Sequence, residues 1–171
     1  MAAVTFQTLW NNYPSEPPYV DAKTGKPPAG YENQCAIKVS VALAKSGVSL
    51  KTFKGNLCPA QPNGTVLATS AQELANWLNT QPFNGCPKAE VYTGKEAFEK
   101  IKGRSGILFL ADYWQRTGET GKTRTGDHID LWNGSRMTSF SSWVRVHFGV
   151  SWDGLWSDYR GASKVMFWPI K

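Results

Sequence analysis

The sequence predicts one α+β domain, because helical patterns fill the first part of the chain and strand patterns fill the rest. Its length of 171 residues is that of a single domain. With 41% hydrophobic and 19% charged residues, the composition is typical of a globular chain and argues against disorder, collagen and coiled coil. We therefore expect residues 1–171 to form one domain with N-terminal helices and an antiparallel sheet.

Two helices are predicted near the N-terminus. Apolar residues recur at i, i+3, i+4 and i+7 over residues 6–13, which is the spacing of one helical face. A proline-rich surface loop over residues 15–30 separates this helix from the next. The second helix is expected over residues 34–45, with Asn33 as its N-cap and Gly47 as its C-terminal stop.

Two further helices begin with capping boxes, in which a Ser or Thr is followed three residues later by Glu. Ser70 and Glu73 predict a helix that runs to the region of Asn79. Thr93 and Glu96 predict a second, shorter helix. Both signals are local, so they predict where each helix begins and not what it packs against.

The apolar pattern then changes to that of strands. Residues 106–114 are typical of a buried strand, and residues 128–132 of a second one. Asn133-Gly134 predicts a two-residue type I′ turn with a return strand over residues 135–140. A last strand is predicted over residues 164–169, at a sheet edge because its proline cannot donate a hydrogen bond to a neighbouring strand.

Charge and hydropathy narrow the function classes. The net charge of +6 suits an anionic partner, but the Lys and Arg residues are dispersed and no nucleic-acid-binding motif is present. The longest apolar run, residues 107–111, is far short of the roughly 20 residues that span a membrane. The N-terminal segment lacks the pattern of a signal peptide, so we expect synthesis in the cytoplasm. Three cysteines without a CxxC pair argue against a zinc site.

Cys35 is the most informative residue of the sequence. It lies in the first turn of a predicted helix, where backbone N–H groups and the helix dipole stabilise a thiolate. This position makes Cys35 a candidate nucleophile, and its backbone N–H is expected to help hold an oxyanion. The alternative is a small buried side chain without chemistry.

A nucleophilic cysteine needs a base, and the chain has two histidines. His128 begins a predicted strand after a polar loop, whereas His147 lies in an aromatic segment, so His128 is the candidate base. The hairpin predicted at Asn133-Gly134 pairs His128 with Ser139, and Asp130 lies on the same face. Either residue can orient the imidazole, and Asp130 is the better one chemically because it is charged. A helix-borne Cys, a strand-borne His and a third polar group form the papain-like layout.

Three segments of the chain carry a family resemblance. They are Asn33-Gln-Cys-Ala-Ile37, Gly126-Asp-His-Ile-Asp-Leu-Trp-Asn-Gly134 and Phe6-x-x-Leu-Trp-x-Asn-x-Pro14. Together they resemble the type VI secretion amidase effectors of the fourth class, which are papain-like cysteine peptidases related to NlpC-type cell-wall hydrolases. The resemblance covers nearly the whole chain.

The resemblance implies a peptidoglycan amidase, a DL-endopeptidase that cuts the amide between D-glutamate and meso-diaminopimelate in stem peptides. It assigns the nucleophile to Cys35 and the base to His128, and it places the third residue, commonly Asp, at Ser139. Because this chain has serine there, Asp130 is the alternative orienting residue. The implied partners are the stem peptide, the type VI secretion apparatus and an immunity protein in the periplasm of the target bacterium, where the effector is delivered. No cofactor or metal is implied.

The groove around such a site has its own candidate residues. Aromatic side chains are candidates for its wall, with a place in the core as the alternative for each. Basic side chains of the loop before His128 are candidates for contact with the carboxylates of the stem peptide, with ordinary solvated charge as the alternative. The candidates are Tyr31, Trp114 and Trp132 for the wall, and Arg116, Lys122 and Arg124 for the carboxylates.

Two questions stay open at the level of sequence. Because the implied compartment is oxidising, we expect Cys58 and Cys86 to pair and Cys35 to stay free, with two unpaired thiols as the alternative. The function alternatives are a transglutaminase-like acyl transferase on the same layout and a non-catalytic module that binds cell wall or nucleic acid. Product analysis separates the first from hydrolysis, because transfer leaves a new amide on the acyl group, whereas hydrolysis leaves a free carboxylate beside the free amine of diaminopimelate.

Overall fold

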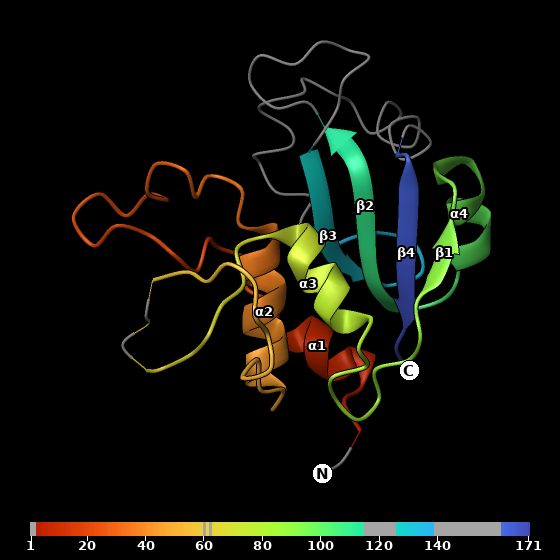
Figure 1. Ribbon diagram of the computed structural model, residues 1–171, viewed down its shortest axis with the longest axis horizontal. Helices are drawn as coiled ribbons and strands as arrows, with labels where there is room; N and C mark the ends of the chain where they lie inside the picture. Colours follow the sequence, from red (N-terminus) through yellow and green to blue (C-terminus); the bar gives the residue numbers. More distant parts are fainter. Residues whose placement is uncertain (1–2, 60, 62, 115–125, 139–161) are drawn as a thin grey trace.

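A four-stranded antiparallel sheet in the order β1-β4-β2-β3 organises the chain (Figure 1). The computed structural model describes residues 3–59, 61, 63–114, 126–138 and 162–171. Its strands are Glu90–Tyr92 (β1), Gly106–Trp114 (β2), Gly126–Trp132 (β3) and Lys164–Pro169 (β4). Its helices are Phe6–Asn12 (α1), Cys35–Lys45 (α2), Ala71–Leu78 (α3) and Gly94–Ile101 (α4). The predicted α+β class and the four predicted helices are confirmed, whereas β1 was not predicted.

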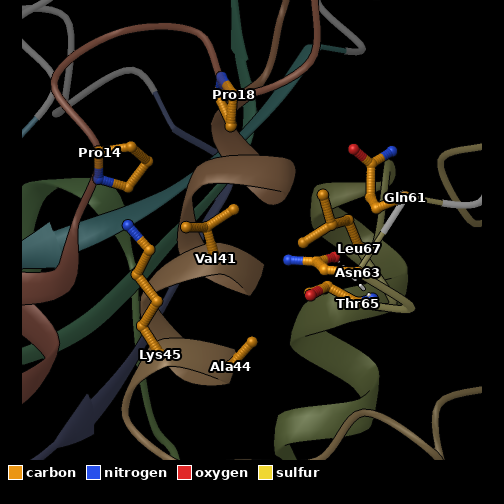
Figure 2. A pocket seen from close by; sticks show the side chains of 9 residues that line it. All are labelled: Pro14, Pro18, Val41, Ala44, Lys45, Gln61, Asn63, Thr65 and Leu67. Atoms are coloured by element: carbon orange, nitrogen blue, oxygen red, sulfur yellow. Dashed lines mark hydrogen bonds between the residues drawn. The ribbon is translucent and has the colours of Figure 1, made fainter.

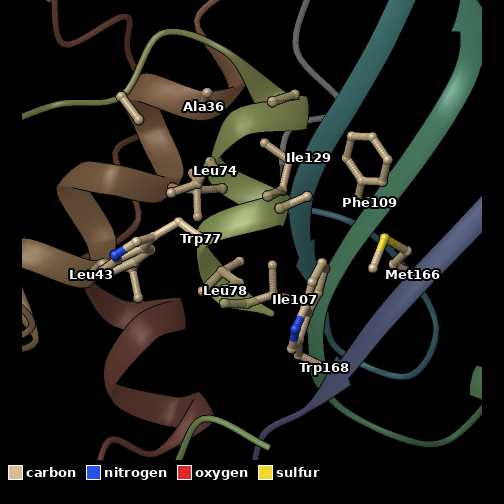
Figure 3. Packing of buried hydrophobic residues seen from close by; sticks show 14 of the residues in the cluster. Ala36, Leu43, Leu74, Trp77, Leu78, Ile107, Phe109, Ile129, Met166 and Trp168 are labelled. Atoms are coloured by element: carbon tan, nitrogen blue, oxygen red, sulfur yellow. The ribbon is translucent and has the colours of Figure 1, made fainter. Parts of the chain in front are cut away.

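The sheet separates two apolar clusters. Along β2, Ile107 and Phe109 belong to the cluster that packs against α1, α2 and α3, whereas Leu108 and Leu110 belong to the cluster that includes residues of α4. This division follows from the alternation of side chains along a strand. Figure 3 shows the larger cluster, in which Leu74 of α3 lies toward α2 and Phe109 and Ile129 come from the strands. No helix among the described residues is long and apolar enough to span a membrane.

The strand β4 lies inside the sheet, which corrects the prediction of an edge strand. It pairs with both β1 and β2, and Pro169 is its last residue, opposite Gly106. The missing proline N–H therefore falls where the ladder ends. Gly106 is required at this point, because a Cβ there would lie 2.1 Å from the carbonyl oxygen of Trp168.

The turn after β3 is longer than predicted. An isolated bridge pairs Trp132 with Met137, so four residues form the loop instead of two. The Asn133 Oδ1 atom accepts the backbone N–H groups of Ser135 and Arg136 at 3.1 and 2.9 Å. This side-chain turn competes with the type I′ turn for the same asparagine. Among the described residues the predicted return strand is reduced to this bridge, and its register is shifted by two residues from the predicted one.

The predicted disulfide between Cys58 and Cys86 is absent. All three cysteines are free and buried, and these two belong to separate apolar clusters. The Cys86 thiol donates to the carbonyl oxygen of Leu78 at 3.5 Å, and burial raises the pKa of Cys86 to about 12. Proximity in three dimensions, which loop composition does not encode, decides the pairing.

The core under α3 can be tested with two leucines of opposite exposure. Leu74 is fully buried, whereas 46% of Leu57 is exposed. Leu74→Ala should lower the free energy of unfolding by about 2–5 kcal/mol, because it removes apolar contacts and leaves a cavity. Leu57→Ala should change it by about 0.5 kcal/mol or less. Urea unfolding followed by tryptophan fluorescence measures both, and equal losses would contradict the assignment of Leu74 to the core.

Candidate active site

Cys35 is the first residue of α2, as the resemblance and the helix pattern predicted. The N-cap is Gln34, one residue later than predicted, and its side chain makes no capping hydrogen bond. Instead, Asn33 Oδ1 accepts the backbone N–H of Cys35 at 3.2 Å. The N–H that we expect to hold an oxyanion is therefore engaged by Asn33.

Gln34 fastens the proline-rich segment beside Cys35. Its Oε1 atom accepts the backbone N–H of Tyr19 at 3.0 Å, and its Nε2 atom donates to the carbonyl oxygen of the same residue. The Tyr19 ring meets Tyr31 edge-on, with ring centroids 4.9 Å apart. The buried Gln34 amide therefore forms hydrogen bonds with the backbone N–H and carbonyl groups of Tyr19, and the capping role falls to its neighbour Asn33.

The structure brings Cys35, His128 and Asp130 together. The helix α2 packs against β3, the strand that carries His128 and Asp130. The His128 Nε2 atom lies 3.5 Å from Asp130 Oδ2, and the Cys35 side chain forms a hydrogen bond with His128. All three residues are buried: Cys35 and His128 are each 7% exposed, and Asp130 is fully buried.

Asp130 is held by the backbone of its own strand and by a hydroxyl from the turn that follows. Its Oδ1 atom accepts the backbone N–H of Leu131 at 2.7 Å and the hydroxyl of Thr138. These two donors occupy one carboxylate oxygen and leave Oδ2 toward the imidazole of His128. Thr138 follows Met137, the residue that bridges to β3, so the four-residue turn places this hydroxyl on Asp130.

The charge of His128 depends on its burial and on its two neighbours, Asp130 and Cys35. Burial disfavours the charged imidazole, but hydrogen bonds and charge interactions with Asp130 and Cys35 favour it. The net result raises the pKa of His128 to about 10. The imidazole is therefore protonated at neutral pH, with one nitrogen directed to a carboxylate and the ring bonded to a thiol.

Other predicted site residues have different outcomes. Trp132 is buried and packs against Phe98. Its Nε1 atom donates to the carbonyl oxygen of Ile101 at 3.1 Å, so Trp132 belongs to the core, which is the alternative to a groove wall. Tyr31 is half-buried against Tyr19. The bridge after β3 pairs Trp132 with Met137 where the prediction paired it with Ser135, and Ser139, the predicted partner of His128, lies outside the described residues. The residues outside the described part of the chain are Ser139, Arg116, Lys122, Arg124, His147 and the side chain of Trp114.

Sequence reasoning missed Lys38, a buried cation in the first turns of α2. Its Nζ atom donates to the carbonyl oxygen of Ser15 at 2.8 Å. The signal that could have found it is its spacing of three residues from Cys35, which places both side chains on neighbouring positions of one helix.

A separate pocket of about 510 Å³ lies against another face of α2 (Figure 2). Neither Cys35 nor His128 is among its lining residues, which come from α2, the proline-rich segment and the loop before α3. They are Pro14, Pro18, Val41, Ala44, Lys45, Gln61, Asn63, Thr65 and Leu67. Within the described residues, no group of three or more His, Cys, Asp or Glu side chains is placed to hold a metal ion.

Comparisons with known proteins give one family and one fold. The family model described as "Type VI secretion system (T6SS), amidase effector protein 4" matches residues 31–168, a range that includes the three clustered residues. The crystal structure of the type VI effector Tae4 from Enterobacter cloacae has a TM-score of 0.64 and 17% identity, and the match covers 99% of this chain and 98% of that one. The effector–immunity system Tae4/Tai4 from Salmonella typhimurium has a TM-score of 0.62 and 12% identity, with 99% and 100% covered. A search of curated proteins found no significant match.

The contact with Asp130 predicts how His128 titrates. Asp130→Asn removes a negative charge that favours the imidazolium, so the pKa of His128 should fall by about 1 unit or more. Asp21→Asn, which changes an exposed carboxylate elsewhere, should leave it unchanged. NMR titration of the imidazole C–H signal, assigned through His128→Asn, measures both variants. An unchanged His128 titration in Asp130→Asn, or a larger shift in Ser139→Ala, would assign the orienting role elsewhere.

Proposed function

Because the chain belongs to the family of type VI secretion system amidase effectors described as amidase effector protein 4, we propose that it is a papain-like peptidoglycan amidase with Cys35 as its nucleophile. The bond that we assign to it is the amide between D-glutamate and meso-diaminopimelate of the stem peptide. The observation that carries this proposal is the hydrogen bond between the buried side chains of Cys35 and His128. A thiol and an imidazole in contact are the two groups that acyl transfer through a thioester requires.

The reaction begins with attack of the Cys35 thiolate on the carbonyl carbon of the amide. The carbon–nitrogen bond then breaks, and the His128 imidazolium gives its proton to the departing amine of diaminopimelate. Water, deprotonated by the neutral imidazole, attacks the thioester and releases the D-glutamate carboxylate and the thiol. Because Nε2 faces Asp130, Nδ1 is the ring nitrogen left for these proton transfers.

Asp130 serves in this mechanism as the residue that orients His128. Its Oδ2 atom faces Nε2, and its other oxygen is held by Leu131 and Thr138, so the carboxylate cannot rotate without losing hydrogen bonds. For the oxyanion, the Cys35 N–H becomes a donor only when Asn33 releases it. The substrate carbonyl would then replace the Asn33 oxygen at the start of α2.

The family also indicates where the enzyme acts. An effector of the type VI secretion system is delivered into a target cell, and we infer that this chain reaches peptidoglycan in the target periplasm. Solved relatives include effector–immunity complexes, such as Tae4–Tai4 from Salmonella typhimurium. We therefore propose a cognate periplasmic immunity protein that blocks access to Cys35.

Loss of either member of the pair should abolish hydrolysis. Cys35→Ala and His128→Ala should each lower the rate of sacculus digestion by about 10³-fold or more, and the double variant should be no worse, because the two residues act as one unit. Cys58→Ala is the matched control, since Cys58 lies in a separate apolar cluster. Mass spectrometry of the released fragments measures the rate and identifies the bond. A folded Cys35→Ala protein with a tenth of wild-type turnover would contradict the mechanism.

Toxicity should depend on the compartment. Expression with an added periplasmic signal sequence should lyse bacterial cells, because the proposed substrate lies in the periplasm. Expression in the cytoplasm should leave growth unchanged, and Cys35→Ala should be harmless in both places. Growth curves and microscopy measure the effect, and equal harm in both compartments would indicate another target.

A further inference from the structure

Lys38 is a buried charge that the mechanism above does not use. Only 6% of the residue is exposed, and its Nζ atom donates to the carbonyl oxygen of Ser15 at 2.8 Å. The same atom lies 5.9 Å from the centre of the Tyr13 ring. Burial lowers the pKa of Lys38, and the negative charges of Asp130 and Glu16 act in the opposite direction. A buried ammonium is costly unless a negative charge balances it.

Lys38 lies beside the catalytic groups in the fold. It follows Cys35 by three residues on α2, so the two side chains occupy neighbouring positions on the helix. The helix packs against β3, which carries His128 and Asp130. Among the described residues, Lys38, His128 and Asp130 are the charged or titratable polar side chains that are buried. Charged side chains ordinarily lie at the protein surface, so three buried ones on two elements that pack together are unusual.

The charges of this cluster balance only when Lys38 is included. A Cys35 thiolate, a His128 imidazolium and an Asp130 carboxylate together carry one net negative charge in a buried site. The Lys38 ammonium brings the sum to zero. Without Lys38, the single positive charge of the imidazolium would oppose two negative charges, those of the Cys35 thiolate and the Asp130 carboxylate. Burial makes such an imbalance unfavourable.

Among the described residues, Lys38 and His128 are the buried basic side chains, so the other elements around the cluster offer no further buried cation. From β3 and its turn come His128, Asp130 and the Thr138 hydroxyl, whereas the Arg136 guanidinium of the turn lies over the Trp10 ring. The segment after α1 contributes the Tyr13 ring and the exposed carboxylate of Glu16. The buried face of α3 is apolar except for the Trp77 indole N–H, which donates to Thr52.

We propose that Lys38 is a positioning residue: it supplies the buried positive charge that allows the Cys35 thiolate to form beside Asp130. Its contact with Ser15 holds the ammonium in place and joins the proline-rich segment to α2. The inference rests on the proposed function only for the role of Cys35 as nucleophile. It predicts a thiol reactivity that can be measured without any peptidoglycan.

The test is the rate at which iodoacetamide alkylates Cys35 between pH 5 and pH 9. The thiolate sulfur displaces iodide, so the rate reports the fraction of thiolate. In Lys38→Met and Lys38→Gln the rate at pH 7 should fall about tenfold, and the pH of half-maximal rate should rise by about 1 unit. Lys38→Arg keeps the charge and should retain the wild-type profile. Peptide mapping separates the Cys35 adduct from adducts of Cys58 and Cys86.

The controls distinguish charge from packing. Lys38→Gln retains a donor for Ser15, so a fall in rate there is due to the lost charge and not to the lost contact. Lys45→Gln removes an exposed lysine at the end of the same helix and should change nothing. An unchanged profile in Lys38→Met and Lys38→Gln would overturn the proposal, as would an equal loss in Lys38→Arg. Failure of both neutral variants to fold while Lys38→Arg folds would also overturn it, because Lys38 would then serve the fold.

The outcome is separable from that of the proposed function. If the Lys38 variants lower Cys35 alkylation as expected while the wild-type protein does not digest sacculi, the inference stands and the assigned substrate is wrong. If sacculi are digested and Cys35 alkylation is indifferent to Lys38, the function stands and this inference falls.

Discussion

Burial of ionised groups between α2 and β3 is the constraint on which this site depends. A thiol, an imidazole and a carboxylate that are nearly inaccessible to water must be balanced by hydrogen bonds and by each other's charges. The helix start supplies Cys35, the strand supplies His128 and Asp130, and the turn after the strand supplies the hydroxyl that holds Asp130. The sheet and the three helices on its face keep these elements in register, and family membership adds that the result is an amidase effector.

The sequence predicted those features whose causes are local. Ser70 caps α3 as expected, with its hydroxyl accepting the Glu73 N–H at 3.3 Å. Cys35 opens α2, and His128 lies on a strand, because helix and strand patterns extend over only a few residues. The position of β4 inside the sheet was not predictable. Pro169 shows only that its own residue lacks an N–H donor, and it does not indicate which strands pair with the residues before it.

What the sequence could not predict depends on partners distant along the chain. The Asn133 side chain could form either of two turns, and the one observed moves the pairing by two residues. Gln34 has no local signal for its bonds to Tyr19, fifteen residues earlier. Lys38 was visible as a neighbour of Cys35 but resembled an ordinary helix lysine, because its burial is a property of the packed fold.

The central claim is that Cys35 carries the acyl group during hydrolysis. The direct measurement is intact-protein mass spectrometry after rapid acid quenching of the enzyme with a purified stem tetrapeptide, followed by mapping of the modified peptide. The account predicts a thioester on Cys35 whose added mass is that of the D-glutamate side of the substrate. It also predicts that the adduct disappears as product forms. Two results would contradict it. The first is product formation without an adduct in the wild-type enzyme, together with undiminished turnover in Cys35→Ala. The second is an adduct that maps to Cys58 or Cys86.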